Sequence, residues 1–297
     1  MDKVCAIVVT FNRLNLLKDV IQSLREQNSK LEEILVVNNN SSDGTKEWLE
    51  IQKDLKVIHQ GNLGGAGGFS TGVKWAFENG YDWFWLMDDD IEMSHDCLQN
   101  LMQFKNVSQC LHPVKYYTDS VIMNWESLLD PTTGRVISLF NKGLENKEIT
   151  FVNVGNFEGM LISRDIVEKI GFPDKRFFIN GDDLIYGYLA SFHTNVSIVR
   201  NAKMIRKKKS TDDEILSDFA IYYFLRNLYL KNEILDFTCP DYKRLRNFYT
   251  NLIFLKTFWS IIDGSIVRNS LKEKFNSVKN ISRAYTHYKE KKINKSF

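Results

Sequence analysis

Short runs of apolar residues alternate with segments of helical periodicity over the first ninety residues of the chain. The apolar runs are rich in β-branched residues and predict buried strands at Val4–Thr10, Glu33–Asn38, Lys56–His59 and Trp83–Met87. Between them, apolar side chains recur every three or four residues and predict helices at Leu14–Gln27, Thr45–Gln52 and Thr71–Asn79. This alternation is typical of an α/β protein whose mainly parallel sheet is flanked by helices and binds ligands at the carboxyl ends of the strands.

The pattern weakens from about residue 110 to 155. Asp130–Gly134 has turn composition and lies between two β-like runs, so we predict a hairpin insertion there. A clear pattern of apolar and polar residues returns at Gly155 and continues to about Ala202. Beyond Arg206 the chain becomes basic and helical, and we therefore expect one domain over residues 1–206 and a mostly helical C-terminal extension over residues 207–297.

The composition of the 297 residues, 43% hydrophobic and 26% charged, is that of a globular protein and excludes a disordered one. The four cysteines have neither CxxC nor metal-ligand spacing, which indicates reduced thiols and a cytoplasmic location. The chain has no run of 18 apolar residues, and its first residues do not have the form of a signal peptide. We therefore expect a protein that does not span a membrane.

The charge is unevenly distributed. Residues 1–199 carry 18 Lys and Arg against 27 Asp and Glu, whereas residues 200–297 carry 21 against 10. A basic C-terminal region can bind nucleic acid, an anionic membrane surface or a phosphorylated lipid. The motifs in the acidic first part of the chain distinguish among these three kinds of partner better than the basic region does.

Three consecutive carboxylates, Asp88, Asp89 and Asp90, follow the predicted strand Trp83–Met87. Carboxylates crowded in this way repel one another unless a cation or strong hydrogen-bond donors lie close by. Oxygen ligands of this kind suit Mg²⁺ or Mn²⁺, which in proteins commonly hold substrate phosphates as well. A solvated acidic turn would explain an isolated triplet, but the glycine-rich segment before it and the Asp pair after it favour a metal site.

Two further segments lie beside predicted strand ends. Thr10, Phe11, Asn12 and Arg13 offer groups that can read a base and a pyrophosphate, although an Asn N-cap followed by an Arg on the helix face explains them equally well. Asn62–Gly72 contains five glycines, which predict close approach of a ligand, unusual dihedral angles or a flexible turn. Because this glycine segment opens a helix, its N–H groups can meet an anion. It matches neither a Walker loop nor a dinucleotide fingerprint.

A carboxylate pair, Asp182 and Asp183, opens a predicted helix after the apolar run Phe177–Ile179. The helix dipole favours the ionised form of a carboxylate at this end, and such a group can act as a general base toward an alcohol. An acidic residue that merely caps the helix is an equal alternative.

Taken in order, these segments resemble the inverting GT-A glycosyltransferases of nucleotide-sugar family 2. The resemblance is carried by TFNR at Thr10–Arg13, VNNNSSDGT at Val37–Thr45, NLGGAGGFSTG at Asn62–Gly72, WLMDDDIE at Trp85–Glu92 and FFINGDDLIYGYLA at Phe177–Ala190. It covers about residues 3–230, and Tyr222–Asn227 is similar to a tyrosine-rich Arg-Asn helix of the galactofuranosyltransferase and rhamnosyltransferase branch. The NxGGxGGF segment followed by MDDD favours galactofuranose over rhamnose.

The resemblance implies a Rossmann-like GT-A fold, with residues 1–206 as a nucleotide-sugar-binding catalytic domain. Asp88 and Asp90 would hold Mn²⁺ or Mg²⁺ together with the donor diphosphate, Asp183 would be the catalytic base, and Asp182 would hold the acceptor hydroxyl. The residues expected at the donor are Thr10, Phe11, Asn12, Arg13, Asn38, Asn62, Gly64, Gly65, Gly67, Gly68 and Asp89. Asp89 either reaches the ribose or braces the turn.

The implied reaction moves a sugar, galactofuranose from UDP-galactofuranose, to a hydroxyl of a lipid-pyrophosphate-linked glycan during synthesis of a bacterial surface polysaccharide. The metal would neutralise the departing nucleoside diphosphate while Asp183 takes the acceptor proton, with inversion at the anomeric carbon. A rhamnosyltransferase or another hexosyltransferase of the same fold is the alternative.

Three departures from the family pattern bear on the site. Asn38 stands where members usually have Asp. Asn201–Arg206 contains no histidine where many members place a metal ligand, so Arg206 is a candidate partner of the diphosphate, and we expect His193 to be a surface or packing residue. Gly155–Gly159 replaces a tryptophan-rich acceptor segment and leaves the acceptor open.

The basic C-terminal region has two explanations of its own. Lys207–Lys209 and Tyr242–Arg246, together with the apolar runs Leu252–Leu255 and Phe258–Trp259, can seat helices on an anionic membrane at the inner face, or the apolar residues pack on the core. We favour the membrane, because transferases of this kind extend lipid-linked glycans. A nucleic-acid-binding protein is the rival from another class; it predicts steep salt dependence but leaves the acidic strand ends unexplained.

Overall fold

The computed structural model describes residues 2–139, 147–211, 217–263 and 271–290. The chain forms two compact units. The first comprises Met1–Leu128, Ser138–Lys175 and Asp182–Asp212, and the second comprises Leu129–Ile137, Arg176–Gly181 and Asp213–Phe297. Two short internal segments therefore belong with the C-terminal helices rather than with the sheet that surrounds them in the sequence.

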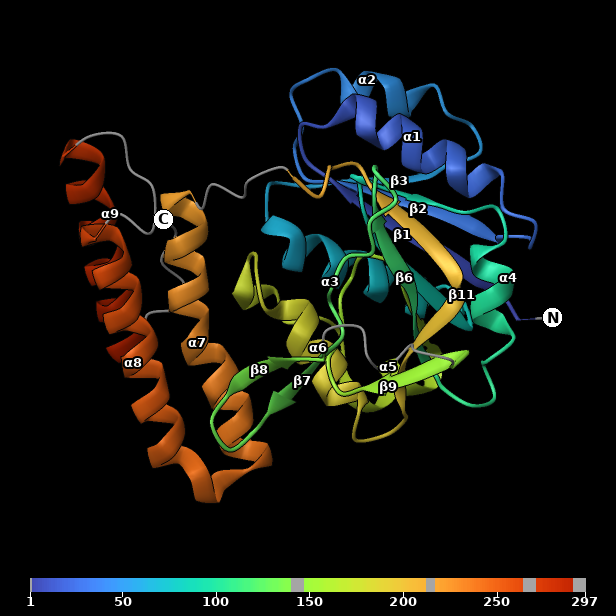
Figure 1. Cartoon of the computed structure of the whole chain (residues 1–297). Helices are drawn as coiled ribbons and strands as arrows, with labels where there is room; N and C mark the ends of the chain where they lie inside the picture. The colour runs from blue at the N-terminus through green and yellow to red at the C-terminus, as the bar shows by residue number, and fades with distance from the viewer. Residues whose placement is uncertain (1, 140–146, 212–216, 264–270, 291–297) are drawn as a thin grey trace. The chain divides into compact units, whose positions relative to one another are not determined.

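The first unit is built on a mixed sheet, in which the described residues form nine strands (Figure 1). The strands are β1 (Val4–Thr10), β2 (Glu33–Asn38), β3 (Lys56–His59), β4 (Trp83–Asp88), β5 (Ile91–Met93), β6 (Cys110–Tyr117), β9 (Ile149–Val152), β10 (Met160–Ser163) and β11 (Val196–Arg206). Their order is β3-β2-β1-β4-β10-β6-β11-β5, with β9 paired to β11. β1, β2, β3 and β4 run parallel, and β10 inserts antiparallel between β4 and β6.

Helices cover both faces of this sheet. One face is covered by α1 (Leu14–Arg25), α2 (Thr45–Glu50) and α4 (Cys97–Met102), and the other by α3 (Gly64–Glu78), α5 (Arg164–Ile170) and α6 (Asp182–Ala190). Because successive strand residues point to opposite faces, Ala6 and Val8 pack with α1 whereas Ile7 and Val9 pack with α3. The expected α/β sheet flanked by helices is confirmed.

The glycine-rich segment differs from its prediction. Helix α3 begins at Gly64, not at Thr71, so these glycines form the first turns of the helix rather than a loop before it. A Cβ on Gly68 would lie 2.4 Å from Cγ1 of Val9, and one on Gly72 would lie 2.4 Å from Cγ2 of Ile7. The missing side chains at these two positions let the helix lie directly on β1.

The weakly patterned region contains both a confirmed and a missed element. The expected hairpin is present as β7 (Ser127–Asp130) and β8 (Arg135–Ser138), and Gly134 takes the positive φ of 69° that its turn requires. Interior strand β6 was not predicted. It carries His112 and Lys115, both fully buried, and these polar residues break the apolar pattern on which strand prediction depends.

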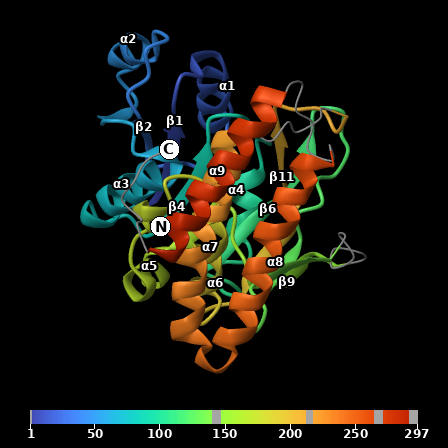
Figure 2. The same ribbon diagram turned by 90° about the vertical axis from the view of Figure 1, so that its left-hand side faces the viewer.

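The second unit consists mainly of α7 (Asp218–Thr238), α8 (Lys243–Ile262) and α9 (Leu271–Lys289), which run side by side in Figure 2. They share a core that includes Tyr222, Leu225, Phe254 and Ile281. Short 3₁₀ turns occur at Lys175–Phe177 and Pro240–Tyr242. The expected helical C-terminal part is confirmed, and none of the described helices is long and apolar enough to cross a bilayer.

Polar side chains of α7 hold the segment Arg176–Gly181. The Arg226 guanidinium donates to the carbonyl oxygens of Arg176 and Phe177, at 2.6 and 2.7 Å. The Asn227 amide donates to the carbonyl oxygens of Phe177, Ile179 and Asn180, at 3.0, 2.7 and 2.8 Å. The Arg-Asn pair thus fixes the backbone of this segment, which leads directly into Asp182.

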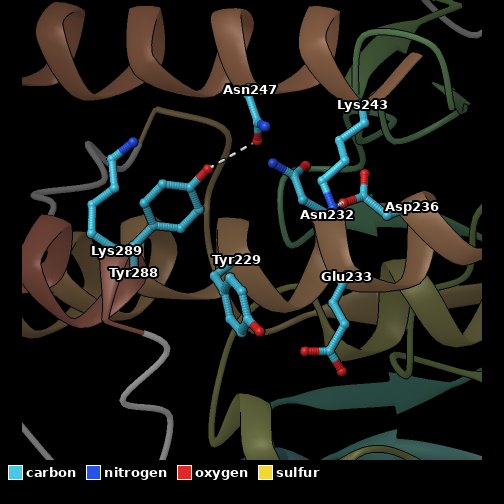
Figure 3. Close-up of a pocket in the computed structure, with 8 residues that line it drawn as sticks. All are labelled: Tyr229, Asn232, Glu233, Asp236, Lys243, Asn247, Tyr288 and Lys289. Atoms are coloured by element: carbon cyan, nitrogen blue, oxygen red, sulfur yellow. Dashed lines mark hydrogen bonds and ion pairs between the residues drawn. The ribbon is translucent and has the colours of Figure 1, made fainter. Parts of the chain in front are cut away.

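A polar pocket of about 400 Å³ lies among the helices of the second unit (Figure 3). It is lined by Tyr229, Asn232, Glu233, Asp236, Lys243, Asn247, Tyr288 and Lys289. Asp236 accepts from Lys243 at 2.9 Å and from the buried Arg246 at 2.7 Å, and the Tyr288 hydroxyl donates to Asn247 at 3.3 Å. These contacts join the three helices to one another.

Candidate active site

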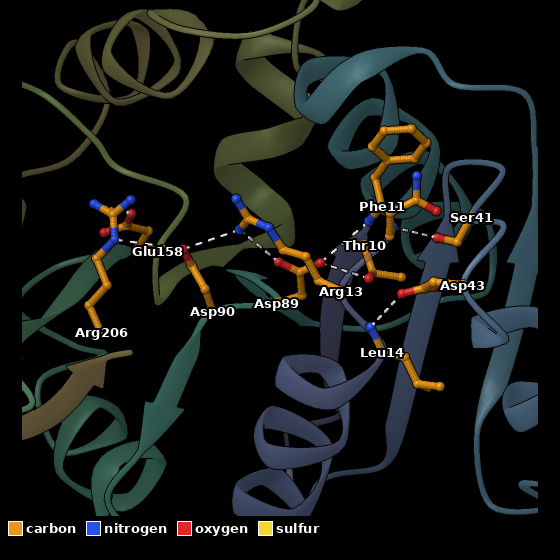
Figure 4. A network of polar contacts seen from close by, with 11 residues as sticks. Thr10, Phe11, Arg13, Leu14, Ser41, Asp43, Asp89, Asp90, Glu158 and Arg206 are labelled. Atoms are coloured by element: carbon orange, nitrogen blue, oxygen red, sulfur yellow. Dashed lines mark hydrogen bonds and ion pairs between the residues drawn. The ribbon is translucent and has the colours of Figure 1, made fainter. Parts of the chain in front are cut away.

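The ends of β1 and β4 meet at one edge of the sheet, because the two strands are parallel neighbours. Asp89 is buried there and accepts hydrogen bonds from the Thr10 hydroxyl at 2.7 Å, the Phe11 amide at 3.3 Å and the Arg13 guanidinium at 3.1 Å (Figure 4). Of the two roles expected for Asp89, these contacts correspond to bracing the turn. They bring the TFNR segment against the acidic triplet.

The loop between β1 and α1 is held by the loop that follows β2. Asn12 has a positive φ of 55°, its backbone N–H donates to the Ser41 hydroxyl at 2.9 Å, and its side-chain oxygen accepts from the Ser42 N–H at 2.7 Å. The first helical N–H, that of Leu14, donates instead to Asp43 at 2.9 Å. The alternative of an Asn12 N-cap is therefore wrong, since Asn12 shapes the loop.

Asn38 and Asn62, both expected at the donor, order the strand ends together with Asn39, for which no role was expected. Asn38 accepts from the Ser41 N–H at 2.9 Å, Asn62 accepts from the Gly64 N–H at 2.9 Å, and Asn39 donates to the Gly64 carbonyl at 3.0 Å. These bonds place the first turn of α3 next to the end of β2. The start of α3 therefore lies at the same edge as the acidic triplet.

The other two glycines of the donor prediction differ in their surroundings. A Cβ added to Gly67 would meet the Leu63 side chain at 2.4 Å, whereas one added to Gly65 would meet nothing within 4 Å. Gly67 therefore serves local packing of the first helical turn. Gly65 leaves the backbone open to approach.

Sequence reasoning assigned no role to Glu158, which completes a group of three carboxylates. Single oxygens of Asp88, Asp90 and Glu158 all lie within 4.8 Å of one another. Glu158 precedes β10, and because Met160 pairs with Leu86 in antiparallel register, the same register carried on places Glu158 opposite Asp88. The order of the strands in the sheet was the missing information.

Cationic side chains contact this acidic cluster, and Figure 4 shows two of them, Arg13 and Arg206. Arg13 lies 3.2 Å from Asp90, and Arg206 lies 3.7 Å from Asp90 and 3.3 Å from Glu158. Lys115, which is fully buried on β6, donates to Glu158 at 2.9 Å. Three cationic side chains therefore contact the cluster, and Arg206, the candidate diphosphate partner, is one of them.

The electrostatics of the cluster fit a hard divalent cation. Burial, followed by repulsion from Glu158 and Asp90, raises the pKa of Asp88 well above its usual value. Although burial raises the pKa of Glu158, Lys115 and Arg206 together bring it below its usual value. Oδ1 of Asp90 is buried without a hydrogen-bond partner. A free carboxylate oxygen beside two other carboxylates is the ligand chemistry of Mg²⁺ or Mn²⁺.

Burial also raises the pKa values of the two carboxylates at the start of α6, Asp182 and Asp183. Burial raises the pKa of Asp183 to about 6, in opposition to the Leu184 N–H that donates to it at 2.7 Å. Burial and the neighbouring Asp183 raise the pKa of Asp182 well above its usual value. At neutral pH a pKa of about 6 leaves Asp183 mostly ionised. Two carboxylates whose environments shift their pKa values by different amounts can divide acid and base roles.

Tight backbone packing holds α6 beside the segment that contains Glu158. A Cβ on Gly187 would lie 1.9 Å from the backbone nitrogen of Gly155, and one on Gly155 would lie 2.9 Å from the carbonyl oxygen of Asp183. By contrast, His193 lies in an exposed turn after α6, so of the two expected positions, surface or packing, it takes the surface one. Both glycines are thus required for the start of α6 to lie next to the acidic cluster.

Comparison with known proteins decides the family. Residues 5–171, more than half of the chain, match the family described as glycosyl transferase family 2. The chain belongs to glycosyl transferase family 2. The matched residues contain β1 to β4, the acidic triplet and Glu158, so this family-2 glycosyltransferase carries its carboxylate cluster within the shared region.

Relatives of this family-2 enzyme include transferases for different sugars. It is 28% identical over 200 residues to the galactofuranosyltransferase GlfT1 of Mycolicibacterium smegmatis, and the matched region covers 62% of this chain and 63% of the relative. It is 27% identical over 281 residues to the GalNAc(5)-diNAcBac-PP-undecaprenol beta-1,3-glucosyltransferase of Campylobacter jejuni, which covers 85% of this chain and 84% of the relative. The chain thus spans less than two thirds of the length of GlfT1.

Solved structures similar to this family-2 enzyme have the expected fold. GalNAc-T7 with UDP, GalNAc and Mn²⁺ matches with a TM-score of 0.60 and 12% identity over 98% of this chain and 56% of that chain. Residues 1–349 of S. aureus TarS, in complex with UDP-GlcNAc, match with a TM-score of 0.58 and 15% identity over 98% of this chain and 88% of that chain. These structures confirm the expected GT-A fold, and the family match confirms the expected glycosyltransferase class.

Proposed function

We propose that this enzyme transfers galactofuranose from UDP-galactofuranose to a hydroxyl of a lipid-pyrophosphate-linked glycan, with inversion and with the help of a divalent metal, in the synthesis of a bacterial surface polysaccharide. The family supplies the reaction class. The galactofuranosyltransferase among the relatives and the NxGGxGGF segment followed by MDDD support the sugar. The undecaprenol-linked glycan in the name of a second relative supports the acceptor class.

The observation that carries this proposal is the pairing of an acidic cluster with a separately tuned carboxylate. Asp88, Asp90 and Glu158 form the cluster, and Asp183 has a pKa of about 6. A carboxylate with a raised pKa close to the working pH is suited to general-base catalysis. The two features together match the needs of sugar transfer from a nucleoside diphosphate, where one group takes a proton and a cation balances the leaving group.

The cluster is the proposed metal site. Asp88 and Asp90 would hold Mn²⁺ or Mg²⁺, and Glu158 supplies a third carboxylate in place of the histidine that this chain lacks. When bound, the metal balances the negative charge of the departing UDP. We assign donor binding to Thr10, Phe11, Asn12, Arg13, Asn38, Asn62, Gly64, Gly65, Gly67, Gly68 and Asp89, which lie at the strand ends and at the start of α3.

Asp183 is the proposed base of the transfer step. Its carboxylate takes the proton of the acceptor hydroxyl while that oxygen forms a bond to the anomeric carbon, on the face opposite UDP. The bond from the anomeric carbon to the diphosphate oxygen breaks, and its electron pair leaves with UDP. Asp182, whose pKa is raised by burial and by the neighbouring Asp183, holds the acceptor hydroxyl through a hydrogen bond.

A donor screen tests the proposal. Transfer to a lipid-pyrophosphate-linked acceptor is measured with Mn²⁺ or Mg²⁺ and UDP-galactofuranose, UDP-galactopyranose, UDP-glucose or dTDP-rhamnose. Turnover with UDP-galactofuranose alone is expected. The glucosyltransferase that matches 85% of this chain makes UDP-glucose the strongest competitor, and a preference for it would keep the fold and mechanism but replace the sugar.

A further inference from the structure

Helix α8 carries six large apolar side chains that are exposed to solvent. They are Leu245, Phe248, Leu252, Leu255, Trp259 and Ile262, with exposed fractions from 39% to 59%. Their spacing alternates between three and four residues, so they lie along one side of the helix. We call these six residues the apolar stripe. Figure 2 shows the helix that bears it running beside α7 and α9.

The apolar stripe is not the side of α8 that holds the helical unit together. The buried residues of α8 are Arg246, Thr250, Phe254 and Ile261, and the helical period of 100° per residue places them on the opposite side from the stripe. Packing of the unit therefore does not account for the stripe. A contiguous exposed apolar surface of this kind marks a place of contact with a protein or a membrane.

The charges on α8 have a single sign. The helix contains Lys243, Arg244, Arg246 and Lys256 and no acidic residue. Arg244 and Lys256 are exposed, and the helical period places them at the two margins of the stripe. An apolar side with Trp, Phe and Leu between basic residues is the pattern of a helix that lies in the interface of an anionic bilayer.

A second copy of the chain fits the apolar stripe less well. Packing two copies of α8 along their stripes would bring basic margins together, with no carboxylate on either helix to pair with them. An anionic lipid surface complements both the stripe and its margins. Lys207, the first basic residue after β11, differs from Arg244 and Lys256 because it already forms ion pairs with Asp19, at 3.3 Å, and with Glu92.

We propose that the apolar stripe of α8 docks the enzyme on an anionic membrane surface. The helix lies parallel to the bilayer plane, with Phe248, Leu255 and Trp259 among the acyl chains and Arg244 and Lys256 at the lipid phosphates. It lies on the bilayer rather than across it, since none of the described helices can span one. This contact needs neither donor nor acceptor and stands apart from the proposed function.

The test measures binding of the whole chain to lipid vesicles by co-sedimentation. One set of vesicles is phosphatidylcholine alone, and the other is phosphatidylcholine mixed with phosphatidylglycerol. We expect binding to the mixed vesicles that weakens as salt is raised. The double variant Phe248→Ser/Trp259→Ser should bind at least tenfold more weakly, because it removes the two most exposed aromatic residues of the stripe.

A matched control comes from α7. Phe237 is 89% exposed and lies outside the stripe, so Phe237→Ser should bind the mixed vesicles as the wild type does. The variant Arg244→Glu/Lys256→Glu should bind mixed vesicles no better than pure phosphatidylcholine, because a lysine or arginine near an anionic surface contributes about fivefold in affinity. Circular dichroism melts check that each variant is folded.

Three results would overturn the proposal. The first is equal vesicle binding by the wild type and the Phe248→Ser/Trp259→Ser variant. The second is equal weakening by the Phe237→Ser control. The third is a wild-type dimer that sedimentation velocity shows to dissociate in the double variant, which would assign the stripe to a second copy. None of these measurements uses a sugar donor, so failure here leaves the transferase proposal untouched.

Discussion

The substitution Asp183→Asn tests the central step of the proposed mechanism. It keeps the size of the side chain and its place at the start of α6 but removes the group that takes the acceptor proton. General-base catalysis contributes about 10² to 10⁴ in rate. We therefore expect kcat to fall by about that factor, which corresponds to roughly 3 to 5 kcal/mol in barrier height. Affinity for UDP should stay unchanged, because the donor residues lie at the strand ends.

The pKa of Asp183 sets the pH dependence of the same reaction. With a pKa of about 6, most of the base is ionised at pH 7, and about a tenth is ionised at pH 5. The rate of transfer by the wild type should therefore fall about tenfold for each pH unit below 6. Asp183→Asn should lack this acidic limb, since asparagine does not titrate.

The pH dependence of the free energy of unfolding provides an independent measure of the pKa of Asp183. Burial raises the pKa of Asp183 in the folded protein, so folding is penalised once the carboxylate ionises. The penalty is absent below the unfolded value near 4, grows as the pH rises, and is complete above about 6. Urea unfolding should thus show Asp183→Asn to be more stable than the wild type at pH 7 and equally stable at low pH.

The assay is initial-rate transfer from pH 5 to 8 with saturating donor, with UDP binding followed by calorimetry. Asp165→Asn is the matched control, since Asp165 also lies in the first turn of a helix but is exposed. Its pH profile should be that of the wild type. Near-full turnover by Asp183→Asn, or an unchanged acidic limb, would refute the assignment of the base.

Four other substitutions probe the acidic cluster and the fold. Asp88→Ala should remove the metal-dependent part of UDP affinity, and unchanged UDP binding by calorimetry with and without Mn²⁺ would count against its role. Lys115→Met removes the buried partner of Glu158 and should lower the free energy of unfolding by about 3 to 5 kcal/mol in urea titrations. Gly68→Ala pushes α3 against β1 and should cost about 1 to 3 kcal/mol, whereas Gly65→Ala meets nothing and should stabilise by up to about 1 kcal/mol, both measured by thermal melts.

Sequence periodicity predicted the elements that bury whole apolar faces. β1 to β4 and the helices between them follow this rule, and their ends fall close to the predicted positions except at the start of α3, which lies at Gly64 instead of Thr71. It failed for β6, because His112 and Lys115 on that strand are buried polar residues. Local patterns describe a residue's neighbours in sequence, whereas these two side chains are accommodated by partners more than forty positions away, such as Asn156 and Glu158.

The candidate site shows the same limit. The motif residues at the ends of β1 and β4 could be brought together from the sequence, because parallel neighbouring strands end at one edge. Glu158 could not, since its place depends on the antiparallel insertion of β10 beside β4. The glycine segment was predicted to allow the close approach of a ligand. This reason does not apply to Gly68 and Gly72, because these two glycines allow α3 to pack against β1.

The Arg226–Asn227 pair has a consequence for how such enzymes can diversify. Its side chains hold the backbone of residues 176–180, the stretch that leads into Asp182 and Asp183. Recombination that replaced everything after residue 206 with the C-terminal helices of a relative would also replace the anchor of that stretch. A chimera should therefore remain active only if the incoming helix brings its own Arg-Asn pair, so that the part of the gene encoding residues 176–183 and the part encoding α7 would have to be inherited together.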